Sequence, residues 1–560
     1  MRFTEAIGVR ASAEPEDQGV FGNHLDLGVF VCYLIFNIWL GLWVARRKMS
    51  DARDYFLAGD RLPWYAIGGS IIAANISTEH FIGMVGAAYA AGFVLAQWEW
   101  GNWFTFSVLI WIFLPYYLRG GIYTMPEFLE RRYNKTCRYL FAVASLILWI
   151  IAQMAVVMLA GAKALEGMFG FNQILTILGL ALLAGSYTIY GGLISVAWTD
   201  FLQFVVLMVG GLIVAIVGLD RVGGPLALMQ AAPDKFKFIY PATDPNYPWF
   251  GLYTLFISIG IWYNCTNQFI VQRCLGARSE WDGRMGVVFA GYMKILLPLL
   301  VVIPGIIAFR LYPGMADPDQ AYPILVRELI PRGLGGIVMA GLASALMSHL
   351  SSVLNSSSTV FTMDLYRPFF HKEGQDRSLV RVGRWSAFWI LAIATALALY
   401  FTRGQHSIFL LIQNVGAWVA APISVVFLLG VLWRRATATA ATFVLIFGFP
   451  YTWLVEYVLF KQWAWLRPYD NWLNRTFLVW ISCMVAMVLA SYLTRAPDTE
   501  KVEGIIWSWK TARMPESERQ RNRGLRNLFF WWALFVGIMA ALYAYVLWFQ
   551  YWGPGKSVSG

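Results

Sequence analysis

Long apolar segments recur along the whole chain and are separated by short polar ones. An apolar run of about 18 residues or more with few charges is typical of a transmembrane helix. The pattern predicts an all-α polytopic membrane protein. About fourteen helices are expected, at residues 27–46, 64–87, 93–117, 138–162, 172–190, 194–219, 249–272, 285–309, 335–364, 383–401, 406–433, 437–459, 474–494 and 528–551.

Two of these segments carry a block of polar residues in the middle, with no nearby proline to explain it. The second contains residues 75–80 (NISTEH) and the seventh contains residues 263–268 (YNCTNQ). Interrupted helices at matching positions of two halves indicate an inverted-repeat transporter. The alternative is that both blocks only hold neighbouring helices together, because Ser, Thr and Asn often do so in membranes.

The spacing of the segments also predicts the organisation of the chain. Two consecutive five-helix repeats are expected, preceded by a peripheral first helix and followed by additional helices. Residues 1–24 are polar and lack the apolar core of a signal peptide. The expected boundaries are 1–24 for an outer tail, 25–47 for the first helix, 64–219 and 249–433 for the repeats, and 436–551 for the additional helices, with a basic connector at 495–527.

The chain is 59% hydrophobic and 13% charged, with a net charge of +11. Reading the odd-numbered loops as cytoplasmic places roughly 28 Lys and Arg there and about 14 on the other side, as the positive-inside rule requires. The basic balance therefore reflects membrane topology, and no nucleic-acid partner is expected. We expect a multi-pass protein of the plasma or inner membrane, with both termini outside and the connector inside.

The sequence offers little chemistry of other kinds. The five cysteines form no CxxC pair, which favours buried thiols over a metal site. No phosphate-binding GxxxxGK[ST] loop occurs, and no nucleophile–base set is recognisable. We therefore expect no enzyme activity and no cofactor other than a coupling ion.

Ionisable and amide side chains within apolar spans are candidate functional residues, because each charge costs about 2.5–3.5 kcal/mol on insertion scales. Glu99 lies in the third span, Lys294 in the eighth and Gln413 in the eleventh. Together with aromatic residues, such groups suit a ligand rich in hydroxyls. The alternative is a structural ion pair between Glu99 and Lys294.

The ninth span carries small and hydroxyl residues at steps of three or four: Ala345, Ser348, Ser352 and Ser356. Hydroxyl and carbonyl oxygens are ligands that suit a small cation. Close helix packing is the alternative, because small residues let helices approach each other.

Several motifs resemble the sodium/solute symporter family, and the resemblance covers roughly residues 25–495. The connector and last span resemble the tail of its sodium–glucose cotransporter branch. The motifs, in order, are AANISTEHFIG at 73–83, IYGGL at 189–193 with WTD at 198–200, NQFIVQR at 267–273 and LNSSSTVFTMD at 354–364.

This resemblance implies a LeuT-type five-plus-five inverted repeat with extra helices, working by alternating access. It also implies roles for individual residues. The sugar positions fall on Asn75, His80, Glu99, Lys294 and Gln413, with Tyr263 as an aromatic gate; the sodium positions fall on the backbone carbonyls of Ala73, Ile76 and Ala345 and the hydroxyl of Ser348; Asp200 matches the acid near the cytoplasmic ion exit.

Two positions depart from the family pattern. Asn264 follows the gating tyrosine where the sugar branch usually has Trp, and His349 follows Ser348 where the family usually has a second serine. We expect a symporter that imports a monosaccharide or cyclitol with sodium. Coupling to protons through His349, or uncoupled transport, is the alternative, and a membrane sensor is a further one.

Overall fold

The computed structural model describes residues 24–46, 51–370, 376–403, 408–463, 466–498 and 502–552. No β-strand occurs in these ranges, and two isolated bridges join Leu62 to Ala277 and Tyr240 to Pro248. The expectation of an all-helical fold is confirmed for this part of the chain.

Ten helical runs in the described ranges are long and apolar enough to cross a membrane. They are α2 (His24–Ala45), the run with α6, α7 and α8 (Phe93–Arg119), α10 with α11 (Lys135–Phe169), α12 (Gln173–Arg221), α16 with α17 (Glu280–Leu311), α19 with α20 (Gly335–Phe370), α21 (Asp376–Phe401), α23 with α24 (Ala438–Gln462), α25 (Trp472–Leu493) and α28 (Leu528–Trp552).

The number of spans depends on how kinked helices are divided. The predicted segments 172–190 and 194–219 are joined within α12, which has 49 residues and bends at Gly192 (φ 58°). A Cβ at Gly192 would lie 2.3 Å from the carbonyl oxygen of Tyr55, so both the positive φ and the close approach require glycine. The count of fourteen stays a prediction.

Both predicted interruptions are confirmed. The first separates α4 (Trp64–Asn75) from His80–Ala91, which contains α5, with a bend of 66°. The second follows α14 (Trp249–Leu255) and two π-helical turns, where Asn267 adopts an extended conformation before α15 (Gln268–Leu275). Ile76 is extended in the same way at the first break.

The broken helix α4 lies at the centre of the bundle, in contact with α12, α16 and α19. The first helix, α2, packs against α12 and α19. Asp26 of α2 accepts a hydrogen bond from Gly336 N at 2.8 Å, which ties it to the start of α19. The last helix, α28, packs against α16.

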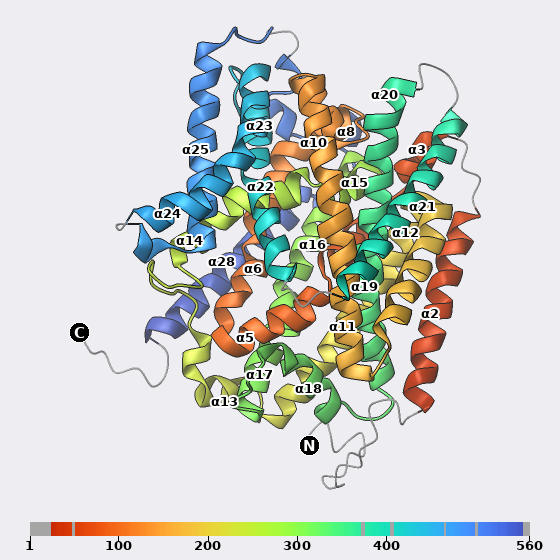
Figure 1. The fold of residues 1–560 in the computed structure, drawn as a ribbon, viewed down its shortest axis with the longest axis vertical. Helices are drawn as coiled ribbons and strands as arrows, with labels where there is room; N and C mark the ends of the chain where they lie inside the picture. The colour runs from red at the N-terminus through yellow and green to blue at the C-terminus, as the bar shows by residue number, and fades with distance from the viewer. Residues whose placement is uncertain are drawn as a thin grey trace.

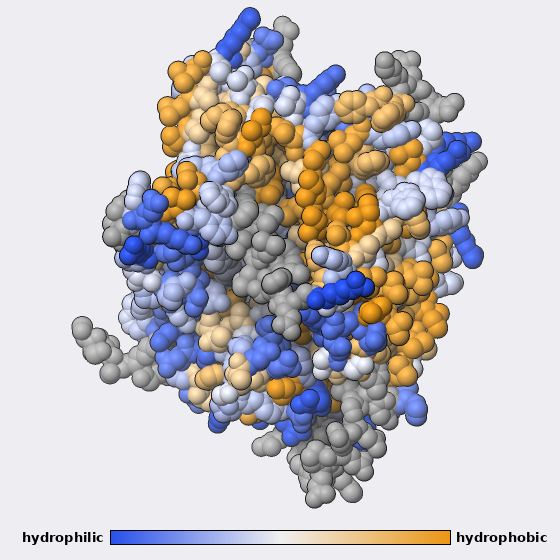
Figure 2. Space-filling model, in the orientation of Figure 1, coloured by the Kyte–Doolittle hydropathy of each residue, from blue (hydrophilic) through white to orange (hydrophobic). Residues whose placement is uncertain are grey.

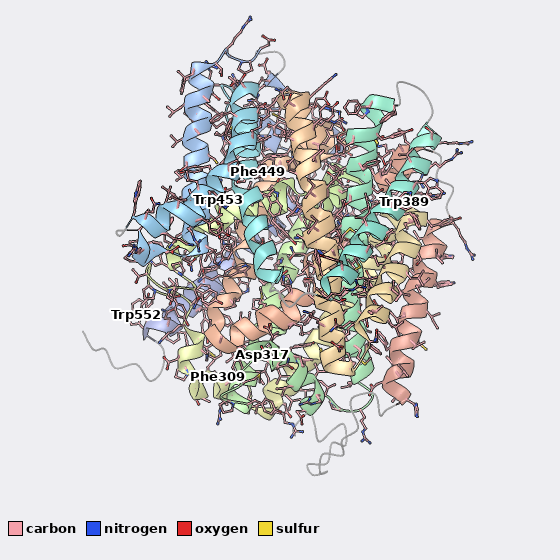
Figure 3. The ribbon with its side chains drawn as sticks, viewed as in Figure 1. Phe309, Asp317, Trp389, Phe449, Trp453 and Trp552 are labelled. Carbon is pink, nitrogen blue, oxygen red and sulfur yellow. The ribbon has the colours of Figure 1, made fainter. Side chains whose placement is uncertain are left out.

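In the view of Figure 2, apolar side chains cover broad areas of the upper and right-hand surface, and hydrophilic ones gather over the lower left and along the rim. Among the aromatic residues labelled in Figure 3, Trp389, Trp453 and Trp552 are 58%, 52% and 68% exposed. A surface of this kind suits lipid contact, because large exposed apolar patches are rare on water-soluble monomers.

The connecting helices gather at two opposite ends of the bundle (Figure 1). α3 (Ala52–Phe56), α8 (Leu114–Arg119) and α20 (Arg367–Phe370) lie near one end. α13 (Pro225–Ala231) and α18 (Ala321–Leu329) lie near the other end.

Candidate functional site

The end of α4 leaves backbone carbonyls that the helix cannot satisfy itself, as at every helix C-terminus. The last regular bond runs from Ile76 N to Ile72 O, at 3.1 Å. Two side chains of α19 cover the next carbonyls: the Ser348 hydroxyl lies 2.8 Å from Ala73 O, and His349 Nδ1 lies 3.0 Å from Ala74 O. The break therefore brings carbonyl and hydroxyl oxygens together, which are ligands suited to a small cation.

The hydroxyl of Ser348 also approaches carbonyls of its own helix. It lies 2.7 Å from Ser344 O and 3.2 Å from Ala345 O. The predicted sodium ligands Ala73, Ala345 and Ser348 thus meet between α4 and α19. Ile76 lies in the extended link directly after α4.

His349 is held in one orientation by its partners. The carbonyl of Ala74 can only accept, so the ring nitrogen facing it carries the hydrogen. Nε2 is buried and faces the backbone of Gln153 without a well-formed hydrogen bond. The ring packs edge-on against Phe269 of α15, with centroids 5.7 Å apart. The imidazole therefore caps a freed carbonyl and does not offer a lone pair to the oxygen cluster.

A second cluster forms around Lys294 of α16. Its ammonium donates to Glu99 Oε2 at 2.5 Å and also to Asn75 Oδ1. Glu99 and Lys294 are only 1% and 3% exposed. The indole of Trp100 donates to Ile295 O at 3.2 Å, and this contact holds α6 (Ala96–Trp100) against α16. The ion pair predicted as an alternative for these two residues is present.

His80 extends this cluster toward the second half of the broken helix. Its Nε2 lies 3.4 Å from Glu99 Oε1, and its Nδ1 accepts from Ser77 N at 3.3 Å. Tyr263 lies close enough to Asn75 and Glu99 to interact with both. A carboxylate, an ammonium, a carboxamide and an imidazole thus surround the first break, and directed donors and acceptors of this kind can bind a polyhydroxylated ligand.

Asn264 is engaged with a neighbouring helix. Its amide nitrogen donates to Asn102 Oδ1 at 2.6 Å and to Thr105 Oγ1 at 2.9 Å, both on α7 (Asn102–Val108). Asn102 in turn donates to the carbonyl oxygen of Glu99 at 3.2 Å. The Oδ1 of Asn264 is buried and has no hydrogen-bond partner in the described part of the chain. Asn264 is therefore linked to Glu99 through Asn102.

Asp200 forms a separate buried cluster. Its Oδ2 accepts from Arg273 Nη2 at 3.0 Å and from the Ser70 hydroxyl at 2.7 Å. Both charged side chains are at most 1% exposed, and Ser352 bonds to both of them. The cluster joins four helices. α4 and α15 belong to the two broken spans, and α12 and α19 carry the residues that bind them here.

The sequence did not identify Arg273 and Ser70 as partners of Asp200. Arg273 stands one residue past the predicted seventh span. One feature of the sequence could have identified this partner: an acid within the membrane needs an opposite charge nearby. Ser352 and Ser356 were read as cation ligands or packing residues, but Ser356 donates to Gln272 Oε1 at 2.7 Å.

Gln413 lies in α22 (Ile408–Leu432), and its side chain falls outside the described part of the structure. The other predicted site residues fall into groups around the first break and its neighbours. Asn75, His80, Glu99 and Lys294 form one contiguous cluster, with Tyr263 beside it. Ala73, Ala345, Ser348 and His349 form the second, and Asp200 lies in the third.

Comparisons with known proteins show that the chain is similar in sequence to membrane transporters. The model of the sodium:solute symporter family matches residues 55–448. A sodium/glucose cotransporter of Vibrio parahaemolyticus is 37% identical over 469 residues, which cover 78% of this chain and 86% of that one. A sodium/myo-inositol cotransporter 2 of Mus musculus is 32% identical over 534 residues, covering 86% of this chain and 79% of that one.

A similar fold occurs among solved structures. A substrate-bound, outward-open Na⁺-coupled sialic acid symporter superposes with a TM-score of 0.74 at 20% sequence identity. The alignment covers 85% of this chain and 99% of that chain. This likeness establishes that the two share a fold.

Proposed function

The chain belongs to the sodium:solute symporter family, and we propose that it imports a monosaccharide or cyclitol together with sodium by alternating access. The observation that carries this proposal is the buried cluster of Asn75, Glu99 and Lys294 at the break of α4. The relatives named for glucose and myo-inositol transport support the same substrate class.

The proposed architecture is a LeuT-type five-plus-five inverted repeat with about fourteen spans. The two breaks, at Ile76 and Asn267, support it because both fall within helices expected to open a repeat. The proposed orientation places both termini outside, since the end of the bundle that holds α3 and α20 carries the more basic loops.

The proposed sodium ligands are the carbonyls of Ala73, Ile76 and Ala345 and the hydroxyl of Ser348. One charge moving across about 100 mV supplies roughly 2.3 kcal/mol, and a tenfold sodium gradient adds about 1.4 kcal/mol. Together they allow about 500-fold accumulation of an uncharged substrate. One sodium ion per cycle therefore suffices for concentrative uptake.

Within this substrate class we favour a ligand with more polar groups than glucose, such as an inositol or an amino or acidic sugar. Position 264 is Asn where the sugar branch usually has Trp, so the stacking surface of an indole is missing. Asn264 adds a buried amide whose oxygen has no described partner. Sites with buried polar groups discriminate strongly against ligands that leave them unpaired.

The proposal is tested with purified protein in liposomes. Uptake of labelled myo-inositol, glucose and galactose is measured under an inward sodium gradient, and then under potassium alone. Lys294→Ala should abolish saturable uptake, whereas Lys163→Ala, which removes an exposed lysine of α11 (Val157–Phe169), should leave it intact. Normal uptake by Lys294→Ala would refute the assignment of the site.

A second candidate is coupling to protons through His349. Imidazole titrates near physiological pH, and the protonated ring donates from both nitrogens. Both nitrogens of His349 face backbone groups, of Ala74 and Gln153. Uptake driven by an inward proton gradient in the absence of sodium would support this candidate over sodium coupling.

A further inference from the structure

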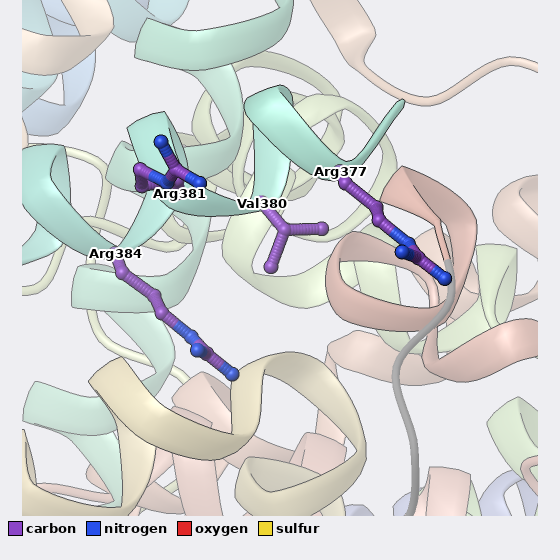
Figure 4. A pocket seen from close by; sticks show the side chains of 4 residues that line it. All are labelled: Arg377, Val380, Arg381 and Arg384. Atoms are coloured by element: carbon purple, nitrogen blue, oxygen red, sulfur yellow. The ribbon is translucent and has the colours of Figure 1, made fainter. Parts of the chain in front are cut away.

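A cavity of about 250 Å³ lies at the first turns of α21, away from the sites described above (Figure 4). It is lined by Arg377, Val380, Arg381 and Arg384. Arg377 and Arg384 extend from the helix on either side of Val380. Three guanidinium groups within two turns of helix make this cavity strongly positive.

Within the described residues, no carboxylate forms an ion pair with the arginines of this cavity. Arg377 and Arg381 are exposed and form no ion pair within the described ranges. The nearby α3 region contains three carboxylates, and each has a partner within that region: Asp51 caps α3 by accepting a hydrogen bond from Asp54 N at 2.8 Å. Asp60 lies 2.5 Å from Arg53, whose pKa it raises by hydrogen bonding, and Asp54 lies 3.2 Å from Arg61.

Arg384 is fixed in place by neutral groups. Its Nη2 donates to the carbonyl oxygen of Tyr190 at 3.0 Å. Its guanidinium lies 5.1 Å from the ring centroid of Tyr190 and 5.9 Å from that of Tyr55. Its Nε is buried and has no hydrogen-bond partner in the described part of the chain. The tyrosines therefore orient this arginine without neutralising its charge.

The same helix continues from the arginines into an exposed aromatic surface. Trp385, Phe388 and Trp389 are 58%, 46% and 58% exposed. Aromatic residues of this kind are enriched where a membrane helix meets the headgroup region. A basic cavity followed along the helix by exposed aromatic residues suits a lipid, which has a charged headgroup and apolar acyl chains.

We propose that this cavity binds the phosphate headgroup of an anionic phospholipid, with the acyl chains along Trp385 and Trp389. Guanidinium groups are suited to phosphate because they donate two parallel hydrogen bonds to its oxygens. Basic pockets beside transmembrane helices bind acidic headgroups for the same reason. A zwitterionic headgroup lacks the net negative charge that three unpaired arginines attract.

The test uses the full-length protein, purified and delipidated in a neutral detergent. Native mass spectrometry measures the binding of dioleoylphosphatidylglycerol, with dioleoylphosphatidylcholine as the neutral comparison. The variant Arg377→Gln/Arg381→Gln removes two exposed charges that form no ion pair with the described residues. The matched control, Arg519→Gln/Arg523→Gln, removes two exposed arginines from the connector.

We expect the anionic lipid to bind more tightly than the neutral one. The cavity variant should lose roughly thirtyfold in affinity, because each basic residue near an anionic surface contributes about 1 kcal/mol. The control should bind as the parent does. An equal loss in the control, or no loss in the cavity variant, would overturn the proposal.

A competition experiment with soluble phosphates distinguishes binding of the lipid from binding of free phosphate. Inorganic phosphate and sn-glycerol 3-phosphate are added as competitors of the lipid. A lipid ligand predicts that neither displaces it at millimolar concentration, because the acyl chains contribute to binding. Displacement by inorganic phosphate alone would show a site for free phosphate and overturn the assignment to lipid.

Discussion

Replacing Glu99 with Gln tests the substrate cluster most directly, because the side chain keeps its size and loses its charge. Glu99 is 1% exposed. One of its oxygens accepts from Lys294 at 2.5 Å, and the other lies 3.4 Å from His80 Nε2. The carboxamide of Gln offers only one acceptor oxygen, so it cannot serve both neighbours in the same way.

Two separate effects of this substitution are expected. A hydrogen bond from a sugar hydroxyl to a charged group contributes about 1.5–3 kcal/mol, so sugar binding should weaken roughly 10- to 150-fold. Removing one partner of a buried ion pair also costs about 3–5 kcal/mol of stability, because the ammonium of Lys294 is left uncompensated.

The double variant Glu99→Gln/Lys294→Met separates the two effects. It leaves no unpaired charge in the cluster, so much of the free energy of unfolding should return. Sugar binding should stay weak, because both charged groups are gone. Isothermal titration with myo-inositol measures the affinity, and unfolding by denaturant in mixed micelles measures the stability.

Two results would contradict these assignments. If Glu99→Gln binds myo-inositol, glucose and galactose as tightly as the parent, Glu99 is not a substrate ligand and the pair is purely structural. If the double variant is as unstable as the single one, the cost does not come from an unpaired Lys294.

Three further predictions concern the neighbouring groups. Asn264→Ala should lower the ratio of myo-inositol to glucose uptake, because the amide is linked to Glu99 through α7; an unchanged ratio would show that Asn264 does not select substrate. His349→Ser should lower the half-saturating sodium concentration for uptake about tenfold, since it adds a hard oxygen ligand; identical sodium dependence in parent and variant would exclude His349 from coupling. Arg273→Met should destabilise the protein by about 3–5 kcal/mol through the buried Asp200, and Asp200→Asn in the same chain should restore much of this; denaturant unfolding that shows only additive losses would contradict the ion-pair account.

The apolar and polar pattern of the sequence was sufficient to predict an all-helical fold with long apolar helices and the two breaks. Both properties are local: an apolar run of sufficient length forms a helix in lipid, and a polar block interrupts it. The breaks at Ile76 and Asn267 fall within the blocks that the pattern marked. The boundary expected between the segments 172–190 and 194–219 likewise coincides with the kink at Gly192 in α12.

Which polar groups meet depends on how the helices pack in the assembled fold. Lys294 is separated from Asn75 by 219 residues and from Glu99 by 195, and helical periodicity gives a side chain's face but not the neighbour opposite it. Arg273 pairs with Asp200, and Asn264 donates to α7, because helices remote in sequence are rotated and packed so that these groups meet. Charges and amides buried in an apolar bundle must find partners there, and the assembled fold alone determines which ones are within reach.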